Sequence, residues 1–332
     1  MEHDPGRARV AIIVVNYNGG ALLARCLEAL ERQTERGFRT IVVDNASTDG
    51  SAEGLEAIHP GVEVLRPGHN LGFAAGNNLG ARHAVDAQWL VTLNPDAFPE
   101  QRCLEVLLGA ARAHPEFAMF QARLVVDANR TLLDGTGDVF HVSGLHWREA
   151  HMRPAGPTDD LPREIFAPCA AAAMYRREAF DAAEGFDEDF FCYAEDVDLG
   201  FRMRLAGERA MYVPDAVVFH VGSGTTSRRS DFSVYHGQRN LVWTYAKDMP
   251  GLLALAYLPC HIAMNAAGVA VLALRGQGRV ALRAKLDALR GLPHMLRKRR
   301  AIQAGRRARA GALRAVMARG WPNRAAIRSK PL

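Results

Sequence analysis

Two short acidic segments carry the side chains best suited to catalysis. Asn94, Pro95 and Asp96 directly follow an apolar run. Because Pro95 fixes the turn, the side chains of Asn94 and Asp96 can point into one cleft. Oxygen ligands of this kind suit Mg²⁺ or Mn²⁺ that also keeps waters and phosphate ligands. One carboxylate cannot hold such an ion unaided, and a plain Asx turn is the alternative interpretation.

The second segment, Glu195 to Asp198, has three acids in four residues. Their mutual repulsion raises the proton affinity of the least solvated one, which is useful for a general base, and Asp196 is the candidate. The alternative is an acid cluster that only favours the helix dipole at a helix start. Asp198 is expected to have that structural role, because Arg202 follows it at the spacing of an intrahelical ion pair.

Two further segments contain residues that suit a nucleotide. Tyr17 and Asp44 each follow an apolar run. An aromatic ring can stack on a base, while a carboxylate accepts a base imino or ribose hydroxyl hydrogen. In the segment from His69 to Asn78, glycines allow close backbone approach, and the helix start behind Gly72 is expected to offer unpaired amides to a ligand.

His220 follows another apolar run and opens a Gly-Ser-Gly loop at residues 222–224, which is a candidate lining for a phosphate site. Structural alternatives stay open for all these segments. They are helix capping, a turn at Asn18 and Gly19, close helix packing through Gly72 and Gly76, and a satisfied structural histidine.

Strand-like and helix-like runs alternate along the first part of the chain. Continuous β-branched runs predict buried strands over residues 10–15 and 40–43, and the pattern repeats with strands predicted over residues 62–65 and 89–93. Apolar residues at helical spacing predict helices over residues 21–33 and 74–85. This order predicts an α/β fold with a mostly parallel central sheet, with helices on both faces and ligands at the carboxyl ends of the strands.

The remaining chain falls into two parts. Residues 123–168 carry many Gly, Pro and Asp residues and are expected to form an excursion over the active-site face. From residue 235 onward the pattern is helical with little strand signal. We therefore predict a catalytic domain over residues 1–228 and a helical C-terminal region over residues 229–332. Arg239 is expected on a solvated helix face, with a diphosphate contact as the alternative.

The C-terminal region is strongly basic. Of the 41 Lys and Arg residues, 17 follow Leu274, where Asp287 is the only acid. Residues 251–274 have no formal charge, but Pro259 and polar neighbours favour two short helices in or near a membrane interface. A transmembrane helix and an ordinary helical pair on the catalytic domain are the alternatives. Because aromatic residues are few, we expect an anionic membrane surface as partner and no nucleic acid.

The cysteines and the N-terminus indicate a compartment. The five cysteines are scattered without a Cys-x-x-Cys pair, and residues 1–9 lack the pattern of a secretory signal. A reducing environment fits these features. We expect a cytoplasmic protein that associates peripherally with the inner face of the cell membrane.

Seven segments, taken in this order, resemble the family 2 glycosyltransferases, in particular the bacterial rhamnosyltransferase-like branch. They are VVNYN, VVDNASTDGS, NLGFAAGNN, LNPD, GFDEDFF, EDVDLGFR and HVGSG, and they span about residues 10–225. The resemblance implies a nucleotide-diphospho-sugar transferase (GT-A) fold and sugar transfer with inversion at the anomeric carbon. It favours dTDP-rhamnose as the nucleotide-sugar donor and a hydroxyl of a cell-surface glycan or lipid-linked saccharide as the acceptor.

The resemblance also implies residue roles. Val15, Tyr17 and Asp44 border the nucleobase, Asn70 and Asn78 help to hold the nucleotide-sugar, Asp96 and His220 bind Mg²⁺ or Mn²⁺, and Asp196 is the general base. The chain departs from the family's common Asp-x-Asp by having Asn94 first, which weakens the metal site. Residues 169–173 also lack the glycine expected before Ala-Met, so the acceptor side is less well defined.

Two alternatives come from other classes. A nucleotidyltransferase explains the Asp96 region but leaves Glu195 and Asp196 without a role. A non-catalytic scaffold that binds a membrane or nucleic acid through the basic tail leaves the acids at the strand ends unexplained.

Overall fold

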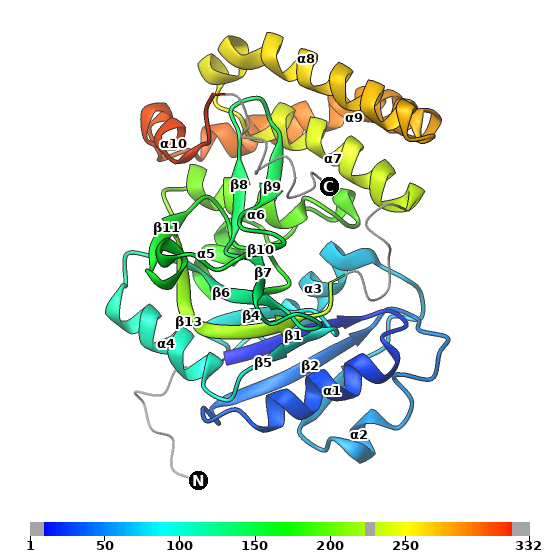
Figure 1. Ribbon diagram of the computed structural model, residues 1–332, viewed down its shortest axis with the longest axis vertical. Coiled ribbons are helices and arrows are strands. Elements are labelled where there is room, and N and C mark those ends of the chain that lie inside the picture. Colours follow the sequence, from blue (N-terminus) through cyan, green and yellow to red (C-terminus); the bar gives the residue numbers. More distant parts are fainter. Residues whose placement is uncertain (1–9, 223–229, 321–332) are drawn as a thin grey trace.

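The computed structural model describes residues 10–222 and 230–320. An 11-stranded mixed sheet with helices on both faces forms one half of this described part, and a stack of helices forms the other half (Figure 1). A two-stranded hairpin lies between the halves and connects the sheet region with the helical stack.

The centre of the sheet is parallel. Its strands, in the order β4, β1, β2 and β3, are β4 (Trp89–Leu93), β1 (Val10–Asn16), β2 (Phe38–Asp44) and β3 (Val62–Leu65). All four predicted strands are therefore confirmed. Strand β1 is buried along its whole length, which accounts for its almost continuously apolar sequence, whereas the edge strand β3 is only partly buried and carries the exposed Glu63.

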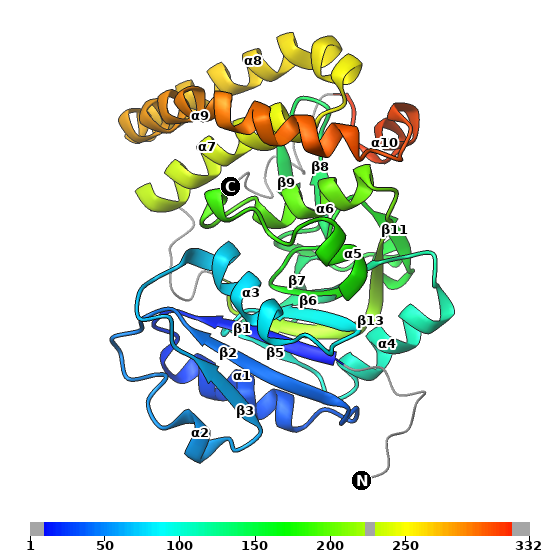
Figure 2. The same cartoon turned by 180° about the vertical axis from the view of Figure 1, so that it is seen from behind.

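Helices cover both faces of the sheet, as predicted (Figures 1 and 2). Ile12 of β1 belongs to a core that includes α1 (Gly20–Glu31) and α4 (Cys103–Ala113). Its neighbour Ile13 points the other way, into a core that includes α3 (Gly72–His83), α5 (Arg177–Ala182) and α6 (Glu195–Leu205). Period-2 alternation along one strand thus divides the interior into two layers.

Antiparallel pairings extend the sheet beyond its parallel centre. Strand β12 (Ala172–Arg176) lies between β4 and β6 (Met119–Val126) and runs antiparallel to both. The long strand β13 (Ala210–His220) runs parallel to β6 and antiparallel to β5 (Ala97–Pro99). This last pairing places His220 opposite Ala97, one residue from Asp96.

Residues 123–168 are more ordered than the predicted excursion. They contain β7 (Leu132–Gly135), β8 (Asp138–Phe140), β9 (His146–Arg148), β10 (Arg153–Pro154), a 3-10 turn η1 (Pro157–Asp160) and β11 (Arg163–Ile165). The β8–β9 hairpin contacts the C-terminal helices: His261 Nδ1 lies 2.7 Å from the Ser143 carbonyl oxygen. Ala318 N also donates to the Phe140 carbonyl at 2.9 Å. Two further short elements are α2 (Leu55–Ile58) and the 3-10 turn η2 (Glu188–Phe190).

The C-terminal region is helical, as predicted. It comprises α7 (Asp231–Asp248), α8 (Gly251–Leu274), α9 (Gly278–Ala304) and α10 (Ala310–Val316). Helices α7 and α9 pack closely. The glycine at position 291 of α9 allows this approach, since a Cβ atom there would lie 2.6 Å from the Trp243 ring of α7. The predicted boundary at residue 228 lies outside the described residues, so the division into domains stays a prediction.

Helix α8 corrects one expectation. The prediction of two short helices over residues 251–274 is wrong, because α8 is a single helix of 24 residues with Pro259 inside it. A proline removes one backbone hydrogen bond and kinks a helix, but a long helix packed along a neighbour can continue past it. By length and composition, α8 alone among the described helices is long and apolar enough to cross a membrane.

A buried ionic cluster joins the sheet half to the helical stack. Lys247 of α7 is fully buried, and its Nζ lies 2.5 Å from Asp198 Oδ1 and also binds Asp187. Asp198 accepts a second bond from Arg202 Nε at 2.8 Å, which confirms the predicted intrahelical pair. Lys298 of α9 binds Asp187 as well. The acids before and within α6 therefore fix α7 and α9 in place.

We expect Lys247→Met to destabilise the protein by about 3–5 kcal/mol, because it leaves buried carboxylates without their shared cation. The midpoint of denaturant unfolding measures this loss. Arg283→Ala is the control, because this side chain is 79% exposed and its removal should change stability by less than about 0.5 kcal/mol. Equal changes in stability for the two variants would show that the buried ionic cluster does not stabilise the contact between the sheet and the helical stack.

Candidate active site

The carboxyl ends of β1 and β2 form one edge of the candidate site. Asn16 and Asp44 are register partners, and Asn16 Nδ2 lies 3.4 Å from Asp44 Oδ1. The ring of Tyr17 is 45% exposed, whereas Val15 is buried under α3, where a Cβ atom at Gly76 would lie 2.9 Å from it. The structure thus brings an exposed ring and a half-buried carboxylate to neighbouring strand ends. Their contact with a nucleobase stays a prediction.

The start of α3 corrects another expectation. The backbone N–H groups of Phe73 and Ala74 donate to the Phe191 carbonyl at 2.7 and 3.2 Å, and that of Gly72 donates to Asn70 Oδ1 at 2.8 Å. These amides are therefore occupied, and the prediction that they are free to bind a ligand is wrong. Gly72 has φ +80°, and a Cβ atom there would lie 2.6 Å from the Phe191 carbonyl oxygen. The glycine is needed for this close approach.

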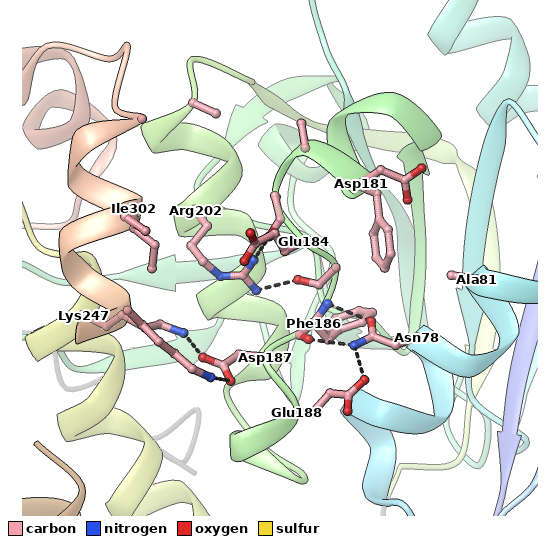
Figure 3. A pocket seen from close by; sticks show the side chains of 18 of the residues that line it. Asn78, Ala81, Asp181, Glu184, Phe186, Asp187, Glu188, Arg202, Lys247 and Ile302 are labelled. Atoms are coloured by element: carbon pink, nitrogen blue, oxygen red, sulfur yellow. Dashed lines mark hydrogen bonds and ion pairs between the residues drawn. The ribbon is translucent and has the colours of Figure 1, made fainter. Parts of the chain in front are cut away.

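Both polar atoms of the Asn78 side chain have hydrogen-bond partners within the protein. Its Oδ1 accepts from Phe186 N at 2.9 Å, and its Nδ2 donates to Phe186 O and Glu188. It lines a cavity of about 670 Å³ whose wall also includes Arg202 and Lys247 (Figure 3). None of the strand-end acids lines this cavity. These contacts favour a structural role for Asn78, and its predicted part in binding the nucleotide-sugar gains no support.

Asp96 and His220 lie side by side, as predicted for a metal pair. His220 Nε2 is 3.2 Å from Asp96 Oδ1 and 3.3 Å from Asn94 Nδ2, and its Nδ1 is 2.7 Å from Asp134 Oδ2. Burial of His220 lowers its pKa, but the nearby Asp134 and Asp96 carboxylates outweigh this effect and raise it to about 9. The sequence pattern did not indicate Asp134.

The geometry of this pair fits a divalent cation. Two ligand atoms that lie about 2.1 Å from one ion, at right angles to each other, are about 3 Å apart. Asp96 Oδ1 and His220 Nε2 meet this condition, and Asp134 orients the other ring nitrogen in the manner usual for metal-bound histidine. Binding of an ion replaces the proton that the imidazole otherwise holds.

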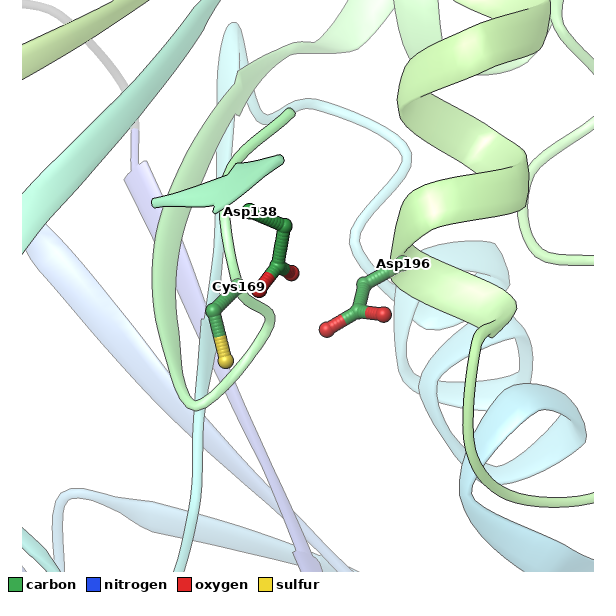
Figure 4. A group of neighbouring side chains, drawn as sticks. All are labelled: Asp138, Cys169 and Asp196. Carbon is green, nitrogen blue, oxygen red and sulfur yellow. The ribbon is translucent and has the colours of Figure 1, made fainter. Parts of the chain in front are cut away.

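Asp196 lies at the start of α6, half-buried (Figure 4). Its Oδ2 accepts from Ala170 N at 3.1 Å and its Oδ1 from Val197 N at 2.9 Å. Burial and the neighbouring charge of Asp196 raise the pKa values of Glu195 and Asp138 well above their ordinary range. The acid cluster therefore has the kind of effect that was predicted, but the raised pKa belongs to Glu195, which is not the residue predicted as the general base.

One short segment connects the two acidic sides of the site. Ala170 N holds Asp196, and the carbonyl of the next residue, Ala171, accepts from Asn94 N at 3.0 Å. The turn that carries Asp96 and the helix that carries Asp196 are therefore attached to adjacent residues. After their predicted roles, we call the Asp96–His220 pair the cation side of the candidate site and Asp196 its base side.

Residues 11–183 match the family model described as glycosyl transferase family 2, which covers more than half of the chain. The chain belongs to this family. The match confirms the resemblance of the sequence motifs and makes the protein a glycosyltransferase, rather than a nucleotidyltransferase or a non-catalytic scaffold.

Relatives of this glycosyltransferase agree with the assignment. N-acetylglucosaminyl-diphospho-decaprenol L-rhamnosyltransferase of Mycobacterium tuberculosis is 31% identical over 239 residues, or 65% of this chain and 77% of the relative. Rhamnosyltransferase WbbL of Escherichia coli K12 is 27% identical, covering 64% and 83%. Mannosyltransferase PcManGT from Pyrobaculum calidifontis, solved with GDP-Man and Mn²⁺, aligns over 94% of this chain and 88% of its own, with a TM-score of 0.54 at 20% identity. That likeness supports the GT-A fold.

Residues 190–194 precede α6, and we call them the base loop after the predicted role of Asp196; the glycosyltransferase holds them through residues that the sequence did not reveal. Phe191, Tyr193 and Ala194 all have positive φ, which is uncommon for such residues. Asn240 of α7, fully buried, donates to the carbonyls of Phe190, Cys192 and Tyr193. The C-terminal region thus stabilises the unusual backbone conformation before α6.

Arg239 acts in the same way. Its Nη2 donates to the carbonyls of Asp189 and Phe190, and its guanidinium lies 4.2 Å from the centre of the Trp243 ring. The expectation of a solvated helix face is wrong, because the base loop folds back over this part of α7. These contacts also occupy the group that the diphosphate alternative requires.

Proposed function

We propose that this glycosyltransferase transfers rhamnose from dTDP-rhamnose, with inversion, to a hydroxyl group of a lipid-linked glycan. The observation that carries the proposal is that the Asp196 carboxylate, held by backbone amides, is attached through residues 170–171 to the turn that carries Asp96. The names of two relatives support the donor sugar, and one of those names specifies a diphospho-decaprenol acceptor.

On this proposal, Asp196 removes the proton from the acceptor hydroxyl as its oxygen attacks the sugar on the face opposite the leaving group. The backbone amides of Ala170 and Val197 orient the carboxylate, which also shares a side-chain hydrogen bond with Asp138. No covalent sugar intermediate is needed. Mg²⁺ or Mn²⁺ bound by Asp96 and His220 would supply positive charge that offsets the negative charge of the leaving diphosphate.

The anomeric configuration of the product tests this mechanism. The enzyme, Mn²⁺, dTDP-rhamnose and a lipid-diphospho-N-acetylglucosamine acceptor are incubated, and the product is analysed by NMR. We expect a rhamnoside with the configuration opposite to that of the donor. Retention would contradict the role of Asp196, whereas the absence of any rhamnoside would contradict the proposed donor and acceptor.

We further propose that α8 and α9 bind the anionic inner face of the cell membrane from the cytoplasm. Helix α8 is the outermost element of the helical stack (Figure 1). Its exposed apolar side chains include Leu252, Leu255, Ile262 and Leu274. On α9, exposed Leu282, Leu286 and Leu289 form one stripe at helical spacing, next to a stripe of exposed Arg279, Arg283, Arg290 and Arg297. Adjacent apolar and basic stripes are typical of helices that lie at an anionic interface.

The double variant Leu255→Glu/Ile262→Glu tests this surface. Each replacement removes about 1.5–3 kcal/mol of apolar burial in the bilayer, so binding should weaken about 100-fold or more. Co-sedimentation with phosphatidylglycerol vesicles measures it. Val85→Glu is the control, because Val85 is 78% exposed beyond the end of α3 and should have no effect. Unchanged sedimentation of the double variant would argue against docking through α8.

A further inference from the structure

Arg148 ends strand β9 and occupies the space between the two sides of the site. It is the register partner of Asp138 in the β8–β9 hairpin. Its Nη1 donates to Asp134 Oδ2 at 2.5 Å, and its Nη2 donates to Cys169 Sγ at 2.8 Å. The side chain as a whole is 22% exposed. One guanidinium group therefore contacts two separate parts of the site.

The first contact leads to the cation side. Asp134 is almost fully buried, and the oxygen that accepts from Arg148 also lies 2.7 Å from His220 Nδ1. This contact directs His220 Nε2 toward Asp96. Partners that orient a metal-binding histidine through its second nitrogen strongly affect both metal affinity and activity. Arg148 fixes the carboxylate that provides this orientation.

The second contact leads to the base side. Polar atoms of Asp138, Cys169 and Asp196 all lie within 4.8 Å of one another (Figure 4). Burial raises the pKa of the Cys169 thiol well above its ordinary value, so its sulfur is a neutral acceptor. The next backbone amide after Cys169 is the one that holds Asp196. Arg148 thus lies against the segment that orients the base.

The backbone beneath Arg148 is shaped to admit it. A Cβ atom at Gly135 would lie 2.4 Å from both Cγ and Cδ of Arg148. The glycine allows the arginine stem to pass close to β7 without a steric clash. Any larger residue at position 135 displaces Arg148 while leaving its charge in the protein.

We propose that Arg148 is a positioning residue that holds the cation side and the base side in a fixed relation, through Asp134 on one side and Cys169 on the other. This inference rests on the proposed function for the roles of Asp196 and of the Asp96–His220 pair. It assigns the β8–β9 hairpin, which no sequence motif marks, a direct part in organising the site. Because the hairpin also contacts α8, the helical stack supports the same arrangement.

Two variants of this region test the inference, and a third is a matched control. Arg148→Ala removes the group, and Gly135→Ala displaces it without changing any charge. Arg163→Ala is the control, because Arg163 is also partly buried at 27% exposure and contacts Thr136 and Glu149 nearby, but not the site acids named above. All three proteins are first compared by thermal unfolding, and binding is measured only for folded protein.

The first readout is the Mn²⁺ concentration that gives half-maximal thermal stabilisation by dTDP, which needs no catalytic turnover. It should rise about 10- to 100-fold for Arg148→Ala, rise in the same direction for Gly135→Ala, and stay unchanged for Arg163→Ala. The second readout is kcat at saturating Mn²⁺, which should stay low for Arg148→Ala because the base side is also displaced. Millimolar guanidinium should restore part of the lost kcat, because it can fill the space that the Arg148 guanidinium leaves in Arg148→Ala.

An Arg148→Ala variant that matches Arg163→Ala in both readouts would overturn the inference. So would a loss of kcat with an unchanged Mn²⁺ requirement and no rescue, because only one side would then depend on Arg148. Failure of the wild-type enzyme to transfer rhamnose would instead contradict the proposed function. The Mn²⁺ requirement for dTDP binding would still test the link between Arg148 and the cation side.

Discussion

Asp196→Asn should lower kcat by about 10²–10⁴, the usual contribution of a general base, and leave the affinity for dTDP nearly unchanged. The amide keeps the size of the carboxylate but cannot take the acceptor proton. The Asp196 carboxylate accepts from two backbone amides and the asparagine oxygen can accept from only one of them, so thermal unfolding of the variant is measured first. Steady-state kinetics combined with dTDP titration separates the two effects.

Asp215→Asn is the matched control for this prediction, because it removes the same charge at an exposed position on β13. It should retain wild-type kcat. Turnover of Asp196→Asn close to that of the control would exclude Asp196 as the base. Loss of dTDP binding in Asp196→Asn would instead place this residue on the donor.

Removal of divalent cations should have an effect of similar size. Chelation with EDTA should lower activity at least about 100-fold, because a bound cation contributes several kcal/mol to stabilising the leaving group. Mn²⁺ or Mg²⁺ added in excess should restore it. Asp96→Ala should show low activity even in excess Mn²⁺, since the pair with His220 is then incomplete.

Asn94→Ala is the comparison for Asp96→Ala, because it alters the same turn without removing the carboxylate. It should retain more activity than Asp96→Ala at every Mn²⁺ concentration. Full activity in EDTA, or equal activity of the two variants, would contradict a cation held by Asp96.

The parallel centre of the fold and the acids that follow its strands were predictable from local patterns. Continuous β-branched runs marked the strands, and strand ends meet at one edge of a parallel sheet. Asp44 and Asp96 were found in this way. The pairing of Asp198 with Arg202 also follows from helical spacing alone.

Other parts of the site depend on contacts between segments far apart in the chain. Asp134, Asp138 and Arg148 come from a stretch without regular periodicity, and they reach the site only because β7 pairs with β6 and the β8–β9 hairpin folds over it. The amides at the start of α3 looked free in sequence, but the Phe191 carbonyl occupies them. Local patterns carry no information on such partners.

Helix α8 shows a different limit of local reasoning. Pro259 was interpreted as a break, yet the helix continues through it. A proline inside a helix removes one backbone hydrogen bond and causes one steric clash. A long helix with intact turns on both sides of the proline can accommodate both effects. The exposed leucines of α8 and α9 became a candidate surface only when the positions of both helices were known.

Release of nucleoside diphosphate from a panel of nucleotide-sugars, with a lipid-diphospho-sugar acceptor and with Mn²⁺ or EDTA, tests the central claim most directly. We expect that release requires both the acceptor and the cation and is fastest with dTDP-rhamnose. Release that is independent of the cation, or no release from any donor in the panel, would contradict it.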